Sequence, residues 1–253
     1  YSMLSPDHQD HDEFIEITPL KIVSVVVCAE LKNTVLDLQK ISAALEKQGE
    51  CVIYQKDRSA KNKLFYNCMV WKIQVRDGPD YFMNLSVKCF PNGKFQYAGF
   101  KTIHAIQLVT RIITSKIRKI EGGMTPPTQK LEIPRIIQIN SGFYLLKDKK
   151  KYQIKQILLN KLLLEKEHIN KGGRIISSSF MPEKYPGINA KFKATTTQQK
   201  PSNKNQVTLL IFATGSVLIN GHNDITQYRE AYYMLCNLLH TYKNELITQN
   251  LLN

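Results

Sequence analysis

The chain has 253 residues, of which 43% are hydrophobic and 22% are charged, as is usual for a globular protein with a sizeable core. Lys and Arg number 35 against 21 Asp and Glu, a formal net charge of +14, which favours a polyanionic partner such as a nucleic acid. No phosphate-loop, dinucleotide-binding, zinc-protease or serine-hydrolase motif is found. We therefore expect no enzymatic activity, no cofactor and no catalytic residue.

Cysteine usage and hydropathy indicate a soluble, intracellular protein. The five cysteines include no C-x-x-C pair, which is typical of reduced thiols. The longest apolar run, 22–29, is far too short to span a bilayer. The first residues are acidic where a signal peptide would be basic. We interpret His8 and His11 as part of a solvated tail and expect no metal site.

The first half of the chain predicts a strand, a helix, three strands and a helix. The opening strand is a β-branched run, and both helices have apolar residues at helical spacing on one face. The predicted strands are 21–27, 65–75, 81–90 and 94–100, and the predicted helices are 36–47 and 104–120.

The second half predicts the same order of elements. Its last helix begins at Asp224, with Asn223 as a plausible cap. The predicted strands are 134–140, 189–196, 207–212 and 216–221, and the predicted helices are 152–167 and 224–246. A twofold internal repeat therefore organises the chain. We expect an acidic tail (1–17), a first repeat (18–120), a turn-rich linker (121–130) and a second repeat (131–253).

The sequence contains the same hairpin pattern twice. Phe90, Gly93 and Gly99 are spaced as Phe212, Gly215 and Gly221 are, 122 residues further on. The glycines fit a short turn with a left-handed residue and the end of the following strand. The two phenylalanines are open to two interpretations, because a Phe before a turn is either part of the core or a ligand contact.

The second half carries a specific resemblance. FMPEKYPG (180–187) followed by LLIFATGSVLING (209–221) resembles the second repeat of the TATA-box-binding protein (TBP) family. The first half resembles the first repeat more faintly, through IVSVVV, LDLQKIS and CFPNGKFQYAG. The long inserts differ from those of cellular members, and the divergence resembles that of a copy encoded by a large nucleocytoplasmic DNA virus.

The resemblance implies an α+β saddle: two pseudo-symmetric repeats forming one curved antiparallel sheet, with helices on its convex face. The concave face of such a saddle lies on the minor groove of DNA, where apolar wedges enter base steps and kink the duplex. The resemblance assigns four intercalating residues: Tyr66 (with Phe65 as the alternative), Phe90, Tyr185 and Phe212. It assigns to DNA binding Lys21, Val23, Lys72, Lys88, Lys94, Gln96, Ala98, Arg135, Ile137, Lys191, Leu210, Leu218 and Asn220.

Departures from the family pattern bear on specificity. Lys21 and Arg135 stand where the family has an Asn that donates to minor-groove acceptors. In the first repeat, polar Lys88 and Gln96 replace apolar groove-facing residues, whereas Leu210 and Leu218 retain them in the second repeat. These departures leave strict TATA preference open. They predict that the second half contacts DNA more typically than the first.

The resemblance also implies protein partners. Glu183 lies on the loop that the family offers to a transcription factor IIB-like protein, although Met181 replaces a residue that is usually acidic. Four residues of the helix 104–120 form a candidate basic patch for regulators, a second factor or DNA backbone, and a solvated helix face explains them as well: Arg111, Lys116, Arg118 and Lys119. We further expect RNA polymerase machinery as a partner, a monomer on DNA and no membrane.

The function predicted from the sequence is that of a TBP-like initiation factor that binds and bends promoter DNA. It would act in the nucleus, or in a cytoplasmic viral factory or virion if the chain is viral. The rival hypothesis is a TBP-fold interaction module of a polymerase or virion assembly with weak or no specific DNA binding. The acidic segment 7–16 suggests either a competitor of DNA or a plain disordered tail.

Overall fold

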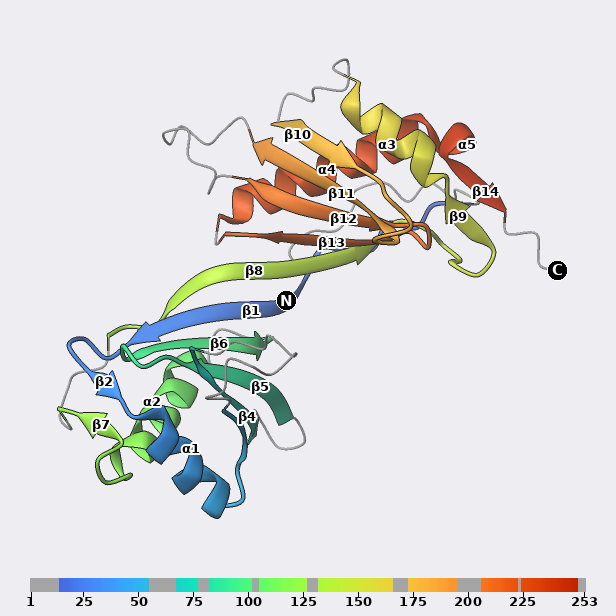
Figure 1. Cartoon of the computed structure of the whole chain (residues 1–253). Coiled ribbons are helices and arrows are strands. Elements are labelled where there is room, and N and C mark those ends of the chain that lie inside the picture. The colour runs from blue at the N-terminus through green and yellow to red at the C-terminus, as the bar shows by residue number, and fades with distance from the viewer. Residues whose placement is uncertain are drawn as a thin grey trace. The chain divides into compact units, whose positions relative to one another are not determined.

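The computed structural model describes residues 14–54, 67–76, 82–101, 105–126, 132–165, 173–194, 206–222 and 224–249. The chain forms two compact units (Figure 1). The first unit is Ser24–Ile137, and the second unit is Tyr1–Val23 together with Gln138–Asn253. Within the described residues, no helix is long and apolar enough to cross a membrane. No group of His, Cys, Asp and Glu in that part of the chain could hold a metal ion.

The first unit is an antiparallel sheet with two helices. Its sheet strands are β1 (Lys21–Glu30, from Ser24 on), β3 (Cys51–Ile53), β4 (Met69–Arg76), β5 (Phe82–Cys89) and β6 (Lys94–Phe100). They run in the order β1-β6-β5-β4-β3. The helices are α1 (Leu38–Lys47) and α2 (Ala105–Arg118), and two short strands, β2 (Val35–Leu36) and β7 (Met124–Thr125), pair with each other.

The second unit has the same arrangement. Its sheet strands are β8 (Arg135–Tyr144, from Gln138 on), β10 (Gly173–Ser179), β11 (Gly187–Ala194), β12 (Val207–Phe212) and β13 (Ser216–Gly221). They run in the order β8-β13-β12-β11-β10 and pair antiparallel. Its helices are α3 (Gln156–Leu164), α4 (Ile225–Thr241) and α5 (Lys243–Leu246), and β9 (Tyr152–Ile154) pairs with β14 (Ile247–Gln249).

The two units repeat each other down to single hydrogen bonds. The Leu31 amide donates to the Gly93 carbonyl at 2.9 Å, and the Leu145 amide donates to the Gly215 carbonyl at 2.9 Å. The Leu36 amide likewise donates to Pro91 at 2.8 Å, as Ile154 does to Ala213. The predicted α+β class and the internal repeat are therefore confirmed.

Glycine closes the two equivalent hairpins in the same way. Gly93 has φ +78° and Gly215 has φ +76°, values in the left-handed region that only glycine adopts without strain. Each donates its amide to the carbonyl of the Phe three residues earlier, at 3.1 Å to Phe90 and 2.9 Å to Phe212. The sequence match between the hairpins thus reflects one turn built twice.

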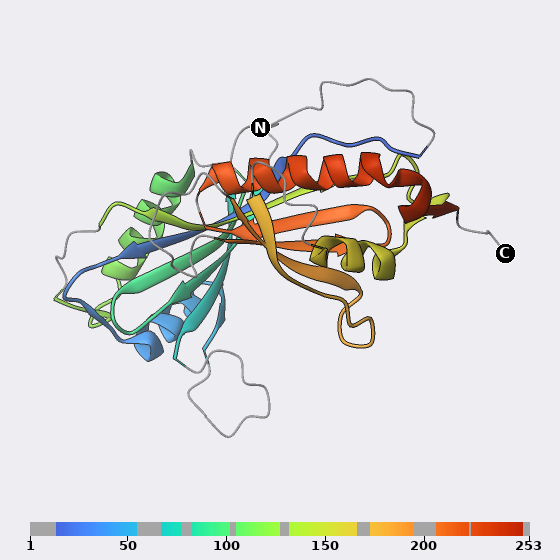
Figure 2. The same cartoon turned by 90° about the horizontal axis from the view of Figure 1, so that it is seen from above.

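In each unit the helices cover one face of the sheet (Figures 1 and 2). In the first unit, buried Trp71 of β4 donates its indole N–H to the Glu50 carboxylate at 3.0 Å. Lys116 of α2 pairs with the same carboxylate, and its Nζ lies 5.6 Å from the centre of the Trp71 ring. Burial raises the pKa of Glu50, but the bonds from Lys116 and Trp71 outweigh it and hold that pKa below its usual value.

The second unit packs its long helix in the same manner. The ring of Tyr232 of α4 meets the ring of Phe143 of β8 edge-on at 4.7 Å. Tyr228, also on α4 and fully buried, donates its hydroxyl hydrogen to the Ile139 carbonyl at 2.7 Å. These contacts attach α4 to β8.

Element boundaries differ from the prediction at both helices of the second unit. The helix expected at 152–167 begins at Gln156, because Tyr152–Ile154 pairs with β14. The helix expected at 224–246 ends at Thr241 and is followed by α5. Its cap is Asp224, whose carboxylate accepts from the Thr226 amide at 3.1 Å, whereas the expected cap Asn223 lies outside the described residues.

The division into units also differs from the predicted one. Residues that precede β1 attach to the second unit: the Thr18 amide donates to Tyr144 at 2.9 Å, and Lys147 donates to Phe14 at 3.1 Å. Residues 14–17 of the expected tail thus contact the second unit. Within the expected linker, Met124–Thr125 forms β7 on the first unit. Residues 1–13 and 127–130, including His8 and His11, lie outside the described residues.

The hairpin glycines give a prediction about stability. A Cβ at Gly93 would lie 2.4 Å from the Leu31 carbonyl oxygen, and one at Gly215 would lie 2.6 Å from Leu146 Cγ. Gly93→Ala and Gly215→Ala should each lower the free energy of unfolding by about 2–4 kcal/mol, measured by urea denaturation. The control is Gly49→Ala, since Gly49 has φ +78° with nothing within 4 Å, and it should cost only about 1–2 kcal/mol. Equal losses at all three positions would contradict the hairpin packing.

Candidate nucleic-acid interface

Each unit has one sheet face that its helices leave uncovered, which we call its open face. Along β12, Leu209 and Ile211 are buried, whereas Leu210 and Phe212 on the opposite face are only half-buried. This period-two alternation follows from strand geometry. Both open faces therefore present side chains that take no part in packing the helices.

The open face of the second unit has an apolar centre. Leu218 of β13 lies directly opposite Leu210 of β12. Val23, which is 47% exposed, lies beside Leu218, since both side chains line the space above Gly142. Polar residues on the same face flank this centre along the strands: Asn140, Ser177, Ser179, Asn189, Lys191, Thr208 and Asn220.

Two aromatic rings stand together at one end of this face. The Tyr185 and Phe212 ring centres are 5.9 Å apart with 58° between the ring planes. Both rings sit over the backbone of Gly187, where a Cβ would lie 3.0 Å from Tyr185 and 3.1 Å from Phe212. Tyr185 is 41% exposed. The structure thus brings together the two residues predicted as the wedge of the second repeat.

Helix α3 fixes the loop that carries Tyr185. Gln156 donates its side-chain amide to the Pro186 carbonyl at 2.9 Å and to the Ile211 carbonyl at 3.0 Å. Within the loop, the Tyr185 amide donates to the Met181 carbonyl at 2.9 Å. These bonds attach the loop to β12, so that Tyr185 is held against Phe212. Glu183 and Met181 are exposed on the same loop.

The open face of the first unit differs from that of the second at equivalent positions. Lys88 lies opposite Gln96 across β5 and β6, at the step where Leu210 lies opposite Leu218 in the second unit. Lys72 lies opposite Ser86, just as Lys191 lies opposite Thr208. Lys72 and Lys191, both predicted to bind DNA, therefore occupy equivalent positions of the repeat.

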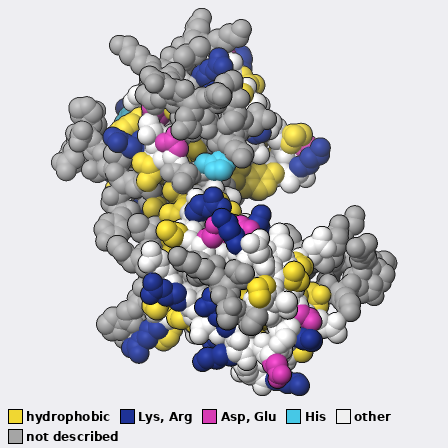
Figure 3. All heavy atoms as spheres, turned by 90° about the vertical axis from the view of Figure 1, so that its left-hand side faces the viewer, with side chains coloured by type: hydrophobic (Ala, Val, Ile, Leu, Met, Phe, Trp, Pro, Cys, Tyr) yellow, Lys and Arg dark blue, Asp and Glu magenta, His cyan; other side chains and the backbone are white. Residues whose placement is uncertain are grey.

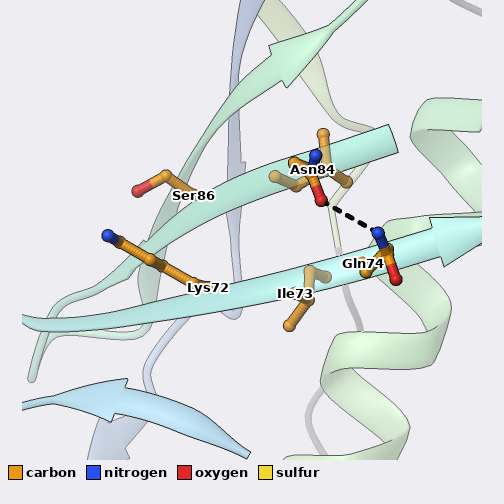
Figure 4. Close-up of a pocket in the computed structure, with 6 residues that line it drawn as sticks. Lys72, Ile73, Gln74, Asn84 and Ser86 are labelled. Atoms are coloured by element: carbon orange, nitrogen blue, oxygen red, sulfur yellow. Dashed lines mark hydrogen bonds between the residues drawn. The ribbon is translucent and has the colours of Figure 1, made fainter. Parts of the chain in front are cut away.

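A hollow of about 540 Å³ in the first unit is lined by six residues of β4 and β5 (Figure 4). Two of these residues bond to each other, since Gln74 donates its side-chain amide to Asn84 Oδ1 at 3.2 Å. The lining residues are Lys72, Ile73, Gln74, Asn84, Leu85 and Ser86. Amide, hydroxyl and ammonium groups so close together suit a ligand with many hydrogen-bonding groups.

Phe90 follows β5 at the place that Phe212 takes at the end of β12. It is half-buried, and its amide donates to the Lys94 carbonyl at 2.9 Å. Its predicted partner Tyr66, with Phe65 as the alternative, lies outside the described residues. The wedge of the first repeat therefore stays a prediction.

The other predicted DNA-binding residues are distributed along the strands. Lys94 and Ala98 share the open face of the first unit with Gln96. Lys21 and Arg135 are exposed at the starts of β1 and β8, and Ile137 is exposed near the start of β8.

The four residues of the predicted basic patch on α2 have different surroundings. Arg111, Arg118 and Lys119 are exposed. Lys116 is half-exposed, and its ammonium pairs with Glu50. Lys116 therefore belongs to the packing of α2 against β4.

Several open-face residues escaped the sequence-based list. Tyr144 lies opposite Ser216 at the end of β8 and is 42% exposed. Asn84, Ser86 and Thr208 were within predicted strands, and their alternation with buried neighbours was the signal that could have identified them. Ser177 and Ser179 lie on β10, an edge strand. Its sequence has three serines and no apolar alternation, so no strand was predicted there.

Charge on the surface is predominantly positive. Lys and Arg side chains recur over the face drawn in Figure 3, whereas Asp and Glu side chains are few. In the whole chain the formal net charge is +14. A polyanion would gain from contact with such a surface by releasing counterions.

The chain is similar to the TBP of Methanococcus jannaschii, with 19% sequence identity and a TM-score of 0.47, over 89% of this chain and 98% of that chain. No family model matches the sequence, and no curated protein matches it. The likeness lends no support to the viral origin expected from the sequence.

The contact between Tyr185 and Phe212 predicts a coupled effect on stability. Tyr185→Ala and Phe212→Ala should show a coupling energy of about 0.5–1 kcal/mol in a double-mutant cycle measured by urea denaturation, since they share one ring contact. In the control cycle, Phe212→Ala is combined with Tyr233→Ala, on α4 and 42% exposed, and there the effects should add. Additivity in both cycles would mean that the two rings do not interact.

Proposed function

We propose that this protein is a TBP-like transcription initiation factor that binds double-stranded DNA through the open faces of its two units. The observation that carries the proposal is the Tyr185–Phe212 pair, standing at the end of an apolar sheet face at the position predicted from the resemblance. An antiparallel sheet with one uncovered apolar face needs a partner for that face. In a chain of net charge +14, DNA fits that role.

The mechanism that follows is deformation-coupled binding. Lys72 and Lys191 contact phosphates from equivalent positions, and Leu210 and Leu218 press on sugars and base edges of the minor groove. Phe212 and Tyr185 enter a base step and unstack it. The cost of unstacking, a few kcal/mol per step, is offset because bent DNA contacts more protein surface.

The two open faces differ in their side chains, so the two units are expected to prefer different base pairs. The apolar pair Leu210 and Leu218 leaves a guanine amino group without a hydrogen-bond acceptor, which disfavours G·C in the minor groove. Gln96 at the equivalent place offers an acceptor through its side-chain carbonyl. We therefore propose that the second unit selects A·T pairs and that the first unit tolerates either pair.

The proposal extends to partners and place of action. Glu183, exposed on the loop that holds Tyr185, would contact a transcription factor IIB-like protein and so connect the DNA to an RNA polymerase. Arg111, Arg118 and Lys119 would contact an acidic regulator. The protein would act without enzymatic activity, as a monomer on DNA, in the nucleus or in a viral factory.

A binding and bending assay tests the proposal. The wild-type chain should bind an AT-rich duplex more tightly than a GC-rich one and should shorten the distance between fluorophores at the duplex ends. Phe212→Ala should weaken binding by at least about tenfold and reduce the bend, because the wedge is lost. Tyr233→Ala on α4 is the matched control and should change neither.

Three outcomes of this assay are informative. Loss of affinity and bend in Phe212→Ala alone supports the proposal. Binding without a bend, indifferent to Phe212→Ala, would leave only non-specific electrostatic attraction. A folded wild-type chain that binds no duplex at low salt would favour the interaction-module hypothesis.

A second experiment replaces one open-face residue of each unit by the residue type that the other unit has. Leu210→Gln should reduce the preference for AT-rich over GC-rich duplex by about five- to tenfold, because it supplies an acceptor for the guanine amino group. Gln96→Leu should raise the preference, because it removes one. Affinity ratios on the two duplexes measure both effects. If both variants changed the preference in the same direction, the assigned difference between the units would be wrong.

A further inference from the structure

One connection of the second unit is longer than its counterpart in the first unit. The repeated hydrogen bonds bracket four residues, 32–35, in the first unit and eight residues, 146–153, in the second. The second connection is therefore four residues longer. The additional length lies in the segment Lys147–Lys151, which reads KDKKK and is exposed throughout. We call this segment the lysine loop.

The lysine loop has a defined shape. The Asp148 carboxylate accepts from the Lys150 amide at 2.8 Å and from the Lys151 amide at 3.2 Å. These two bonds lower the pKa of Asp148. The one acidic side chain of the loop thus serves to hold the turn. Lys151 Nζ lies 4.9 Å from the centre of the Tyr152 ring.

The loop reaches the open face. Lys149 Nζ lies 4.3 Å from the centre of the Tyr144 ring, a distance at which a cation is attracted by the ring. Tyr144 is on the open face, opposite Ser216 of β13. Buried Leu146, next to the loop, packs against Gly215 of the turn that follows Phe212. The lysines therefore stand beside the hairpin that carries the aromatic pair.

The shorter connection of the first unit shows the contrast. It contains one basic residue, Lys32, which pairs with Glu132 at 2.5 Å. That pairing raises the pKa of Lys32 and uses its charge within the unit. The lysine loop carries four lysines against one carboxylate. The connection of the second unit therefore carries a larger net positive charge than the shorter connection of the first unit does.

We propose that the lysine loop binds the phosphate backbone of DNA just outside the base step entered by Tyr185 and Phe212. This inference rests on the proposed function and adds to it a contact with flanking DNA on one side of the kink. At that place a kink turns the flanking duplex relative to the bound element, and lysines there can neutralise several phosphates without reading bases. The contact would give the complex a longer footprint beyond the second unit than beyond the first.

The salt dependence of binding tests the loop. The probe is an AT-rich element with a GC-rich arm on each side. Replacing the four loop lysines by Gln should lower the slope of log affinity against log salt by about two to three, as expected for lost phosphate contacts. The matched control replaces Lys40, Lys47, Lys155 and Lys161, which lie on or beside α1 and α3, by Gln. It removes the same charge and should leave the slope nearly unchanged.

A second measurement locates the contact. An iron chelate attached to Lys149→Cys should cut the duplex in one arm only, outside the A·T element. The same chelate on Lys161→Cys should not cut, and the wild-type chain gives the background from native thiols. Equal slopes for the two quadruple variants together with no cut from position 149 would overturn the loop contact. Tight, bent binding by the wild type in that same experiment would leave the proposed function intact, whereas no binding at all would refute both.

Discussion

The two faces of an antiparallel strand cannot both be covered by the helices of one layer, and this constraint governs the molecule. In each unit, one set of alternate residues packs under helices, as Trp71 does near α2 and Phe143 does under α4. The other set is left on the open face. The buried set is apolar in both units, apart from Ser141 of β8. The two units differ in the residue types of the open set, because these residues do not pack in the core and can contact a binding partner instead.

The two units share their hairpin turns but differ in the residues of their open faces. The hairpin turns, their glycines and the hydrogen bonds that attach them to the rest of each unit are the same in both halves, since the backbone path depends on them. At the equivalent cross-strand pair, Lys88 and Gln96 stand in one unit, and Leu210 and Leu218 in the other. The lysine loop is a further difference confined to one unit. A molecule built this way has one scaffold and two unlike contact surfaces.

The sequence predicted the α+β class, the repeat and most sheet strands, because alternation and helical periodicity are strong in segments such as 207–212 and 105–118. It missed β2, β3, β7, β9 and β14, which are two or three residues long and depend on pairing partners distant in sequence. It also missed the seven-residue edge strand β10, whose three serines conceal any apolar alternation. It placed Tyr185 beside Phe212 only through the resemblance, since no local pattern links a loop residue to a strand end. It could not foresee that Lys116 would pair with Glu50, because the two are 66 positions apart.

The central claim is that the open faces, and not the helical surfaces, contact DNA. Lysine reactivity measured by mass spectrometry, with and without an AT-rich duplex, tests it on the unaltered chain. Bound duplex should protect Lys72 and Lys191 from acetylation and leave Lys40 and Lys161 on the helices as reactive as before. Protection of the helical lysines, with Lys72 and Lys191 unchanged, would contradict the account.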